Sequence, residues 1–257
     1  MIEPQNERAV LTLTDVCKQF SKNAKPVLSN VSFSVFEQDC IVVSGQNGSG
    51  KTVLMTLIAD LEQPSSGSIY RKQYNGKEIS VGLVFQDADT QILGDTVEED
   101  ILFGVRNSCF APLERTQRLE SVLKQLGLSE KRKDPARSLS GGEKRRLAVA
   151  GILMMEADMI IFDEPFANLD FPGVVQVTSM LQQLKNAGKT IIVLTHELEK
   201  VLALANRLLI LHKGMLVYDA APKTALESGV LAQYGIRNPL CTYSRIEDLI
   251  WSADEPQ

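Results

Sequence analysis

The chain has 257 residues, of which 44% are hydrophobic and 23% charged, as expected for a globular protein that buries one sizeable core. Its 27 Lys and Arg residues against 32 Asp and Glu residues give a net charge of −5, which argues against binding nucleic acid through the overall electrostatic field. No apolar run approaches the roughly 18 residues of a membrane span, residues 1–8 carry no signal-peptide core, and no two of the four cysteines form a C-x-x-C pair, so we expect a cytoplasmic protein with reduced thiols.

Strands and one helix are predicted in the first third of the chain. The strand candidates are Val10–Val16, Val31–Phe36, Cys40–Ser44, Gly67–Arg71 and Ile79–Gln86. A helix is predicted over Lys51–Leu61. From about Thr96 to Met155 the pattern is helical, and one helix face that ends at Gly127 carries Leu119, Val122, Leu123 and Leu126.

Strands and helices alternate again in the last third. The predicted elements are a helix Pro172–Asn186, a strand Thr190–Leu194, a helix to about Ala205, and strands Arg207–His212 and Met215–Tyr218. Such alternation favours a mainly parallel sheet covered by helices. The helical middle is therefore predicted to be an insertion into one α/β domain.

A phosphate-binding loop is predicted by the motif G-x-x-x-x-G-K-[ST], which the sequence matches at Gly45, Gln46, Asn47, Gly48, Ser49, Gly50, Lys51 and Thr52. Backbone N–H groups in such a loop surround phosphate, the lysine adds a positive charge, and the Thr hydroxyl is a ligand for Mg²⁺. The alternative is an ordinary glycine-rich turn. The apolar strand before the loop and the apolar helix after it favour nucleotide binding.

Two acidic residues, Asp163 and Glu164, follow the apolar run Met159–Phe162. Paired carboxylates at the end of a buried strand repel each other and lose hydration unless a cation or a proton-transfer role compensates. Asp163 suits the Mg²⁺ shell and Glu164 suits a general base for water. The alternative, a strand-to-loop corner with solvated acids, is disfavoured by the phosphate-binding loop.

The run Leu139-Ser140-Gly141-Gly142-Glu143 resembles the LSGGQ signature of the ATP-binding-cassette (ABC) ATPases in four of five positions. Taken alone, it could be a glycine turn and a helix cap. In the family, the signature closes on the ATP held by the other subunit, so the resemblance implies a second ATPase subunit and a trans contact through Ser140, Gly141, Gly142 and Glu143. The departure is Glu143 in place of glutamine.

The resemblance extends to the remaining family motifs. It implies that Gln86 contacts Mg²⁺ and the attacking water, that Ala167-Asn168-Leu169-Asp170 is the D-loop at the dimer interface, and that His196 is the switch histidine. Phe20 matches the aromatic residue on which adenine stacks, with a core aromatic as the alternative. His212 has no such context and is interpreted as structural.

Two basic runs, Lys131–Lys133 and Lys144–Arg146, are interpreted as solvated helix faces or ends, with contact to a membrane partner as the alternative.

One region resembles the energy-coupling-factor ATPases, which drive uptake of vitamins, cobalt or nickel. The matching stretches are Val84–Leu93, with Gln91 as a second glutamine, Thr96–Gly104, and Ala232–Leu240. The resemblance implies a transmembrane coupling protein and a substrate-binding membrane protein as partners. Phe171-Pro172-Gly173 and Glu37-Gln38-Asp39 depart from the subfamily pattern, and an ATPase of an ordinary ABC importer for ions or amino acids remains the alternative.

The resemblance therefore implies a P-loop NTPase of α/β class with a mainly parallel sheet, an antiparallel β subdomain and an inserted helical subdomain. We expect an ABC ATPase domain over 8–240, with core segments 8–85 and 157–218, a helical subdomain 86–156, and a C-terminal extension 219–257 as a candidate dimer contact.

Such a subunit hydrolyses ATP with Mg²⁺ at the cytoplasmic face of the cell membrane, as a homodimer or with a paralogue. A non-transport ABC protein is disfavoured because long coiled coils and a second cassette are absent, and a catalytically dead subunit because every catalytic position is filled.

Overall fold

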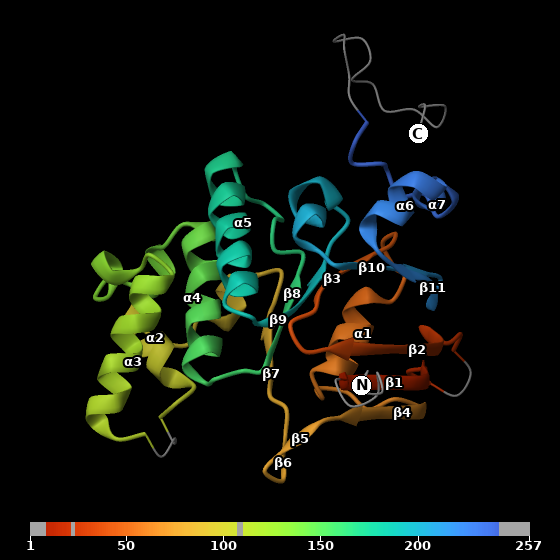
Figure 1. Ribbon diagram of the computed structural model, residues 1–257. Coiled ribbons are helices and arrows are strands. Elements are labelled where there is room, and N and C mark those ends of the chain that lie inside the picture. The colour runs from red at the N-terminus through yellow and green to blue at the C-terminus, as the bar shows by residue number, and fades with distance from the viewer. Residues whose placement is uncertain (1–8, 22–23, 107–109, 242–257) are drawn as a thin grey trace, which may run out of the picture.

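The computed structural model describes residues 9–21, 24–106 and 110–241, and its centre is a six-stranded sheet of order β11-β10-β3-β9-β8-β7 (Figure 1). The strands are β3 (Cys40–Ser44), β7 (Val81–Val84), β8 (Met159–Asp163), β9 (Thr190–Leu194), β10 (Arg207–His212) and β11 (Met215–Ala220). All neighbours pair in parallel except β10 and β11, which are antiparallel. The mainly parallel sheet predicted from the sequence is confirmed.

The central strands are buried on both faces, which is why they read as continuous apolar runs. Every residue of β3, β8 and β9 is buried. Ile41 and Val43 belong to a core shared with helix α1 (Lys51–Ile58), whereas Val42 belongs to a second core on the opposite face. Figure 1 shows the sheet between α1 on one side and α4 and α5 on the other.

A second, three-stranded antiparallel sheet covers the α1 side of the molecule. It consists of β1 (Ala9–Lys18), β2 (Leu28–Phe36) and β4 (Ser66–Arg71), and a small hairpin of β5 (Gln73–Tyr74) and β6 (Lys77–Glu78) follows it. Burial alternates along most of β2 and in parts of β1, as expected for strands with one face toward a core. The predicted antiparallel β subdomain is therefore present.

The middle of the chain is helical, as predicted. It contains the 3₁₀ turns η2 (Ala88–Gln91), η3 (Ser129–Lys131) and η4 (Ala136–Ser138) and the helices α2 (Val97–Phe103), α3 (Pro112–Gln125) and α4 (Gly141–Met154). Capping boxes start α2, between Thr96 and Glu99, and α4, between Ser140 and Glu143. The apolar face predicted before Gly127 is buried in the core beneath these helices.

One predicted helix is wrong. After α5 (Phe171–Asn186) and β9, the chain forms two 3₁₀ turns, η5 (Leu198–Lys200) and η6 (Leu202–Leu204), instead of one helix to Ala205. Val201, between them, has φ −141° and ψ −18°, outside helical values. The buried residues Leu198, Val201 and Leu202 have the i, i+3, i+4 spacing of an α-helix, which explains the prediction, but the backbone of Val201 interrupts the helix and leaves two short turns.

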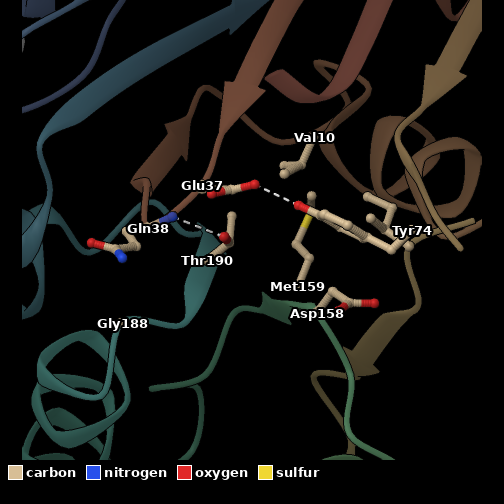
Figure 2. Close-up of a pocket in the computed structure, with 9 residues that line it drawn as sticks. Val10, Glu37, Gln38, Tyr74, Asp158, Met159, Gly188 and Thr190 are labelled. Atoms are coloured by element: carbon tan, nitrogen blue, oxygen red, sulfur yellow. Dashed lines mark hydrogen bonds between the residues drawn. The ribbon is translucent and has the colours of Figure 1, made fainter. Parts of the chain in front are cut away.

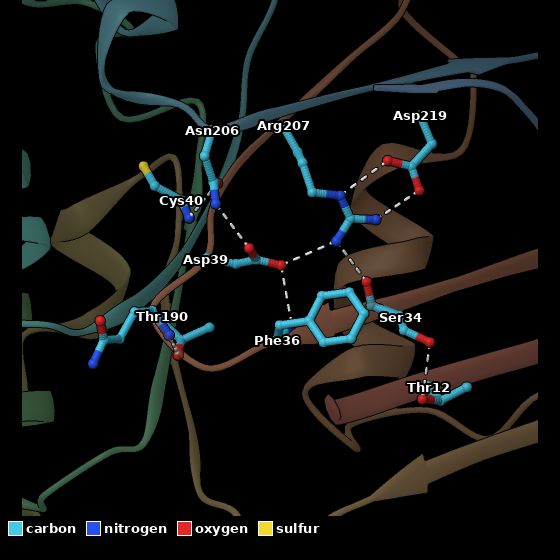
Figure 3. Close-up of polar contacts among 10 residues, drawn as sticks. Thr12, Ser34, Phe36, Asp39, Cys40, Thr190, Asn206, Arg207 and Asp219 are labelled. Carbon is cyan, nitrogen blue, oxygen red and sulfur yellow. Dashed lines mark hydrogen bonds and ion pairs between the residues drawn. The ribbon is translucent and has the colours of Figure 1, made fainter. Parts of the chain in front are cut away.

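Polar side chains at the amino ends of the strands join the two sheets (Figure 3). Asp39 is buried and accepts hydrogen bonds from Arg207 Nη1 (3.0 Å), Asn206 Nδ2 (2.9 Å) and the Phe36 amide (3.0 Å). Arg207 also pairs with Asp219, and Asn206 Oδ1 accepts from the Cys40 amide (2.9 Å). This network ties β2, β3, β10 and β11 together.

Beside this network lies a cavity of about 390 Å³ (Figure 2). Met159, Ile79 and Val10 contribute its apolar surface, while the Glu37 carboxylate accepts a hydrogen bond from the Tyr74 hydroxyl and Thr190 Oγ1 accepts one from the Gln38 amide. The carboxylates of Glu37 and Asp158 and the Thr190 hydroxyl in this cavity already have protein partners.

Two short helices, α6 (Pro222–Ser228) and α7 (Val230–Gln233), follow β11 and pack on the core that contains α4 and α5. No helix in the described ranges is long and apolar enough to cross a membrane.

Candidate active site

The site lies at the carboxyl edge of the six-stranded sheet. Because β3, β9, β8 and β7 are neighbours and run in parallel, the segments that follow them meet at one edge. These segments carry the predicted phosphate-binding loop after β3, Thr195 and His196 after β9, Asp163 and Glu164 at the end of β8, and Gln86 after β7. Motifs more than a hundred residues apart are thus brought together.

The phosphate-binding loop wraps tightly around the N-terminus of α1. A Cβ on Gly45 would lie 2.1 Å from the Leu211 carbonyl oxygen, and Gly50 has φ +102°, which favours glycine. Helix α1 has no side-chain cap, in contrast to α2 and α4. Its first turn therefore presents backbone N–H groups suited to an anion.

Gln46, Asn47 and Gly48 lie on the exposed part of this loop, whereas Ser49 is buried. Gln46 also lies against the chain that follows α7, because a Cβ on Gly235 would come within 2.4 Å of its Nε2 atom. In the described part of the chain, the Ser44 and Ser49 hydroxyls are among the few buried side-chain groups without a hydrogen-bond partner. Unpartnered buried hydroxyls beside a phosphate-binding loop are compatible with a ligand that completes them.

Lys51 is buried and its Nζ donates to the carbonyl oxygens of Gly45 (2.7 Å) and Gln46 (3.2 Å). Burial lowers the pKa of Lys51, while the carboxylates of Glu164 and Asp163 act in the opposite direction. A buried ammonium whose hydrogen-bond partners are main-chain carbonyl groups suits the negative charge of a polyphosphate.

Asp163 faces the start of α1 from β8. Burial raises the pKa of the Asp163 carboxyl and Glu164 adds to this effect, whereas the nearby Lys51 ammonium and Thr52 side chain act against it. Two crowded carboxylates next to a hydroxyl form an oxygen-rich set that suits Mg²⁺. No group of three or more His, Cys, Asp or Glu side chains in the described ranges is arranged to hold a metal, so Mg²⁺ here would depend on phosphate and water oxygens as well.

The backbone of Glu164 has a left-handed conformation, and both of its carboxylate oxygens have partners. Its backbone has φ +44°, which is uncommon for a residue other than glycine, and its amide donates to the Leu194 carbonyl (2.8 Å). Its Oε2 atom accepts a hydrogen bond from Thr195 Oγ1 (2.9 Å), and its Oε1 atom lies 2.9 Å from His196 Nδ1. Both carboxylate oxygens are thus fixed from the end of β9.

Thr195 is a site residue that the sequence analysis missed. It is fully buried, and besides donating to Glu164 its Oγ1 accepts from the Glu197 amide (3.0 Å). The available signal was a hydroxyl residue directly between the apolar strand Thr190–Leu194 and His196.

The signature turn lies on the other face of the sheet from α1. Ser140 Oγ accepts a hydrogen bond from the Glu143 amide (3.4 Å), and Glu143 Oε2 accepts from the Ser140 amide (2.8 Å). Partial burial acts to raise the pKa of Glu143, but the hydrogen bonds from Ser140 and the nearby Lys131 lower it. The nearest non-local atoms to Gly141 and Gly142 belong to Leu169 and α5 rather than to the phosphate-binding loop.

The D-loop leads into α5. Asp170 is the N-cap of this helix, and its Oδ1 atom accepts a hydrogen bond from the Gly173 amide (2.9 Å). The departure Phe171-Pro172-Gly173 therefore has a local role, because Pro172 lies in the first turn of α5 and Gly173 completes the cap. The Phe171 side chain is 80% exposed.

The two remaining aromatic predictions have different outcomes. Phe20 is 61% exposed, and Lys18 Nζ lies 5.3 Å from its ring centre, so the alternative of a core aromatic is wrong. The His212 ring packs against Tyr234 with centres 5.2 Å apart, which agrees with a structural role.

The two predicted glutamines after β7, Gln86 and Gln91, differ in exposure and in hydrogen bonding. Gln86 is exposed, whereas Gln91 bonds the open edge of β7, accepting from the Phe85 amide (2.8 Å) and donating to the Leu83 carbonyl (2.7 Å).

The basic runs are only partly solvated. Arg132 and Lys133 pair with Glu98, and Lys144 pairs with Asp89 (2.6 Å). Arg145 is 5% exposed, so the prediction of a solvated face is wrong there; helix α4 packs that side against the loops of the site.

Comparisons with known proteins agree with this geometry. The sequence pattern of the family described as "ABC transporter" matches residues 28–167. The chain is 36% identical to the energy-coupling factor transporter ATP-binding protein EcfA of Carboxydothermus hydrogenoformans, over 86% of this chain and 84% of that protein. It is 35% identical to the cobalt import ATP-binding protein CbiO of Rhodobacter capsulatus, over 83% of this chain and 80% of that protein.

Among solved structures, the chain superposes on cbiO1 from Clostridium perfringens, described as part of the ABC transporter complex cbiONQ. The TM-score is 0.78 at 27% sequence identity, and the match covers 88% of this chain and 94% of that one.

Proposed function

Because the chain belongs to the ABC transporter family as an ATP-hydrolysing subunit, we propose that it powers uptake of a vitamin or a transition-metal ion through an energy-coupling-factor complex. The observation that carries the ATPase part is the convergence of Lys51, Asp163, Glu164 and His196 at one edge of the sheet. The uptake part is supported by the relatives described above, whose names refer to energy-coupling factors and cobalt import.

Hydrolysis is proposed to proceed by attack of water on the γ-phosphate, with ADP as the leaving group. The N–H groups of the loop Gly45–Thr52 and the Lys51 ammonium hold the phosphates, and adenine stacks on the exposed ring of Phe20. Glu164 orients the water and accepts its proton. Since His196 Nδ1 lies against Glu164 Oε1, the opposite ring nitrogen, Nε2, is left to contact the γ-phosphate.

Thr52, Asp163 and Gln86 are the residues proposed to hold Mg²⁺. When bound, the ion neutralises charge that develops on the phosphate oxygens. The Thr52 side chain acts to lower the pKa of Asp163, which places the two side chains near each other, and Gln86 follows the neighbouring strand β7.

The site is proposed to be completed by a second ATPase subunit, either a copy of this chain or a paralogue. Helix α4 and helix α1 lie on opposite faces of the sheet, so the signature turn of one chain is directed away from its own phosphate-binding loop. Ser140 Oγ accepts from Glu143 and keeps its own proton for donation to the γ-phosphate of the partner's ATP. The D-loop residue Asp170 would lie at the same interface.

A groove between β7, η2, α2 and α4 is proposed to receive a cytoplasmic helix of the transmembrane coupling protein, which would hold the ATPase at the cytoplasmic face of the membrane. Its lining includes Leu93, Phe103 and Met155, which are 62%, 39% and 48% exposed. Gln91 lines the same groove and is hydrogen-bonded to Leu83 and Phe85 at the end of β7. A helix that binds in the groove and displaces Gln91 would therefore also displace the segment that carries Gln86.

The test is purification of the full chain from membranes together with whatever it binds. Recovery of a transmembrane coupling protein and a small substrate-binding membrane protein is expected. Recovery of a permease pair that depends on a soluble binding protein would contradict this proposal and favour the ordinary importer.

A further inference from the structure

Arg145 is a buried arginine one turn after the start of α4, and none of the roles above uses it. Only 5% of its surface is exposed. In the described part of the chain no carboxylate lies within ion-pair distance of its guanidinium, and its Nε atom has no hydrogen-bond partner. A buried cation without a carboxylate partner is costly unless other dipoles compensate.

The compensating dipoles are two main-chain carbonyl groups from separate loops. Arg145 Nη2 donates to the Gln86 carbonyl oxygen (3.1 Å) and to the Ala167 carbonyl oxygen (2.7 Å). Arg145 belongs to α4, the helix that begins at the signature turn, so one side chain ties this helix to the segment after β7 and to the D-loop.

The electrostatics favour keeping these loops together. Burial lowers the pKa of Arg145, and the nearby Asp87 acts against this effect. If the Gln86 or the Ala167 carbonyl group moved away, the guanidinium would stay buried but lose a hydrogen-bond acceptor. Movement of one of these loops without the other therefore costs free energy.

The neighbouring basic residues do not make such a bridge. Among the described residues, Lys144 Nζ pairs only with Asp89 on η2, and Arg146 Nη1 donates only to Gln176 Oε1 (2.7 Å) on α5. Arg146 is therefore a matched control on the same helix.

We propose that Arg145 is a positioning residue that makes the signature turn, the Gln86 segment and the D-loop change position together. This inference rests on the proposed pairing of two ATPase subunits, in which Gln86 serves the chain's own ATP and Ser140 serves the partner's. Arg145 then couples the two composite sites of the dimer, because a shift at one loop is passed to a loop that acts on the other nucleotide.

The experiment compares Arg145→Lys and Arg145→Met with the control Arg146→Lys in the full chain. Lysine keeps the charge on a shorter side chain with a single ammonium group, so it is expected to satisfy fewer of these contacts. In nucleotide-free protein, we expect hydrogen exchange of residues 86–91 and 167–170 to become about 10-fold faster in both Arg145 variants. Exchange within β3 and β9 should not change, and Arg146→Lys should leave all these segments as in the parent chain.

The second readout separates positioning from binding. ATP turnover of the Arg145 variants should fall about 10-fold and lose its cooperative dependence on ATP, while ATP affinity measured by calorimetry stays within about two-fold. Unchanged exchange and turnover would overturn the inference. A uniform rise in exchange with a parallel loss of ATP binding would also overturn it, because Arg145 would then be merely structural.

The inference and the proposed function can fail separately. If the parent chain, alone or with its paralogue, showed no ATP turnover, the proposed function would be wrong and the coupling of two sites with it. If the parent turned over ATP but the loops of the Arg145 variants exchanged like those of the parent, the proposed function would stand and the role of Arg145 would not.

Discussion

Polar side chains at the two ends of the six-stranded sheet differ in how fully their hydrogen bonds are satisfied within the protein. At the amino end, Asp39, Asn206 and Arg207 satisfy one another and nearby main-chain groups (Figure 3). At the carboxyl end, Glu164 has a left-handed backbone and Ser49 Oγ is buried without a partner. The same strands therefore end in a completed network on one side and in an incomplete one on the other. Completed polar networks hold a fold together, whereas groups left incomplete are suited to a ligand.

The largest effect is expected at the carboxyl end. Glu164→Gln removes the proposed general base, so ATP turnover should fall by at least about 100-fold. Thermal unfolding should not move to lower temperature, because the amide keeps one acceptor and relieves the repulsion with Asp163. Steady-state phosphate release checks this prediction, and near-normal turnover would show that another group is the base.

The opposite result is expected at the amino end. Asp39→Ala removes one of the two carboxylate partners of the half-buried Arg207 and the acceptor of the Asn206 Nδ2 and Phe36 N–H groups, and should lower the free energy of unfolding by about 2 kcal/mol. Turnover at a temperature where the variant is folded should stay within about two-fold of the parent. Denaturant unfolding measures the loss, and Asp219→Ala, which removes a more exposed partner of the same arginine, should have a smaller effect. Equal losses would contradict the central position given to Asp39.

A smaller kinetic effect is expected at Thr195. Thr195→Val keeps the shape of the side chain and removes the donor to Glu164 Oε2, so kcat should fall about 10-fold with little change in KM for ATP. Thr195→Ser restores the hydroxyl and should recover most of the rate. If serine behaved like valine, packing rather than the hydrogen bond would explain the loss.

The smallest effect is expected outside both ends of the sheet, in the helical region. Hydrogen bonds from Arg132 and Lys133 hold the pKa of Glu98 at about 2, below its ordinary value of 4.5. A lowered pKa means that the contribution is present above about pH 4.5 and is lost as the pH falls toward 2. Glu98→Gln should therefore lower stability on the order of 1 kcal/mol near pH 7. The difference from the parent should shrink below pH 4.5 in unfolding curves, and a constant difference would exclude the ion pair as its cause.

Sequence reasoning succeeded where a short motif directly follows a strand. The phosphate-binding loop and the pair Asp163 and Glu164 could be located because their neighbours are continuous apolar runs. The parallel order of the strands then explains why these motifs meet at one edge.

It failed where the role of a residue depends on its neighbours in space. Thr195 is a buried hydroxyl whose partner, Glu164, comes from an adjacent strand. Arg145 lies in a charged run, but the packing of α4 against two loops buries it. Neither relation is encoded in local spacing.

The close approach of Gly235 to Gln46 has a practical consequence for shortened or fused forms of the protein. The chain that follows α7 forms part of the wall around the first variable position of the phosphate-binding loop, although the two are separated by most of the sequence. A truncation before Gly235 would remove a neighbour of that loop, and a substitution at Gly235 would push on it. Reporter proteins or affinity tags inserted close to Gly235 would therefore lie beside the predicted phosphate-binding loop.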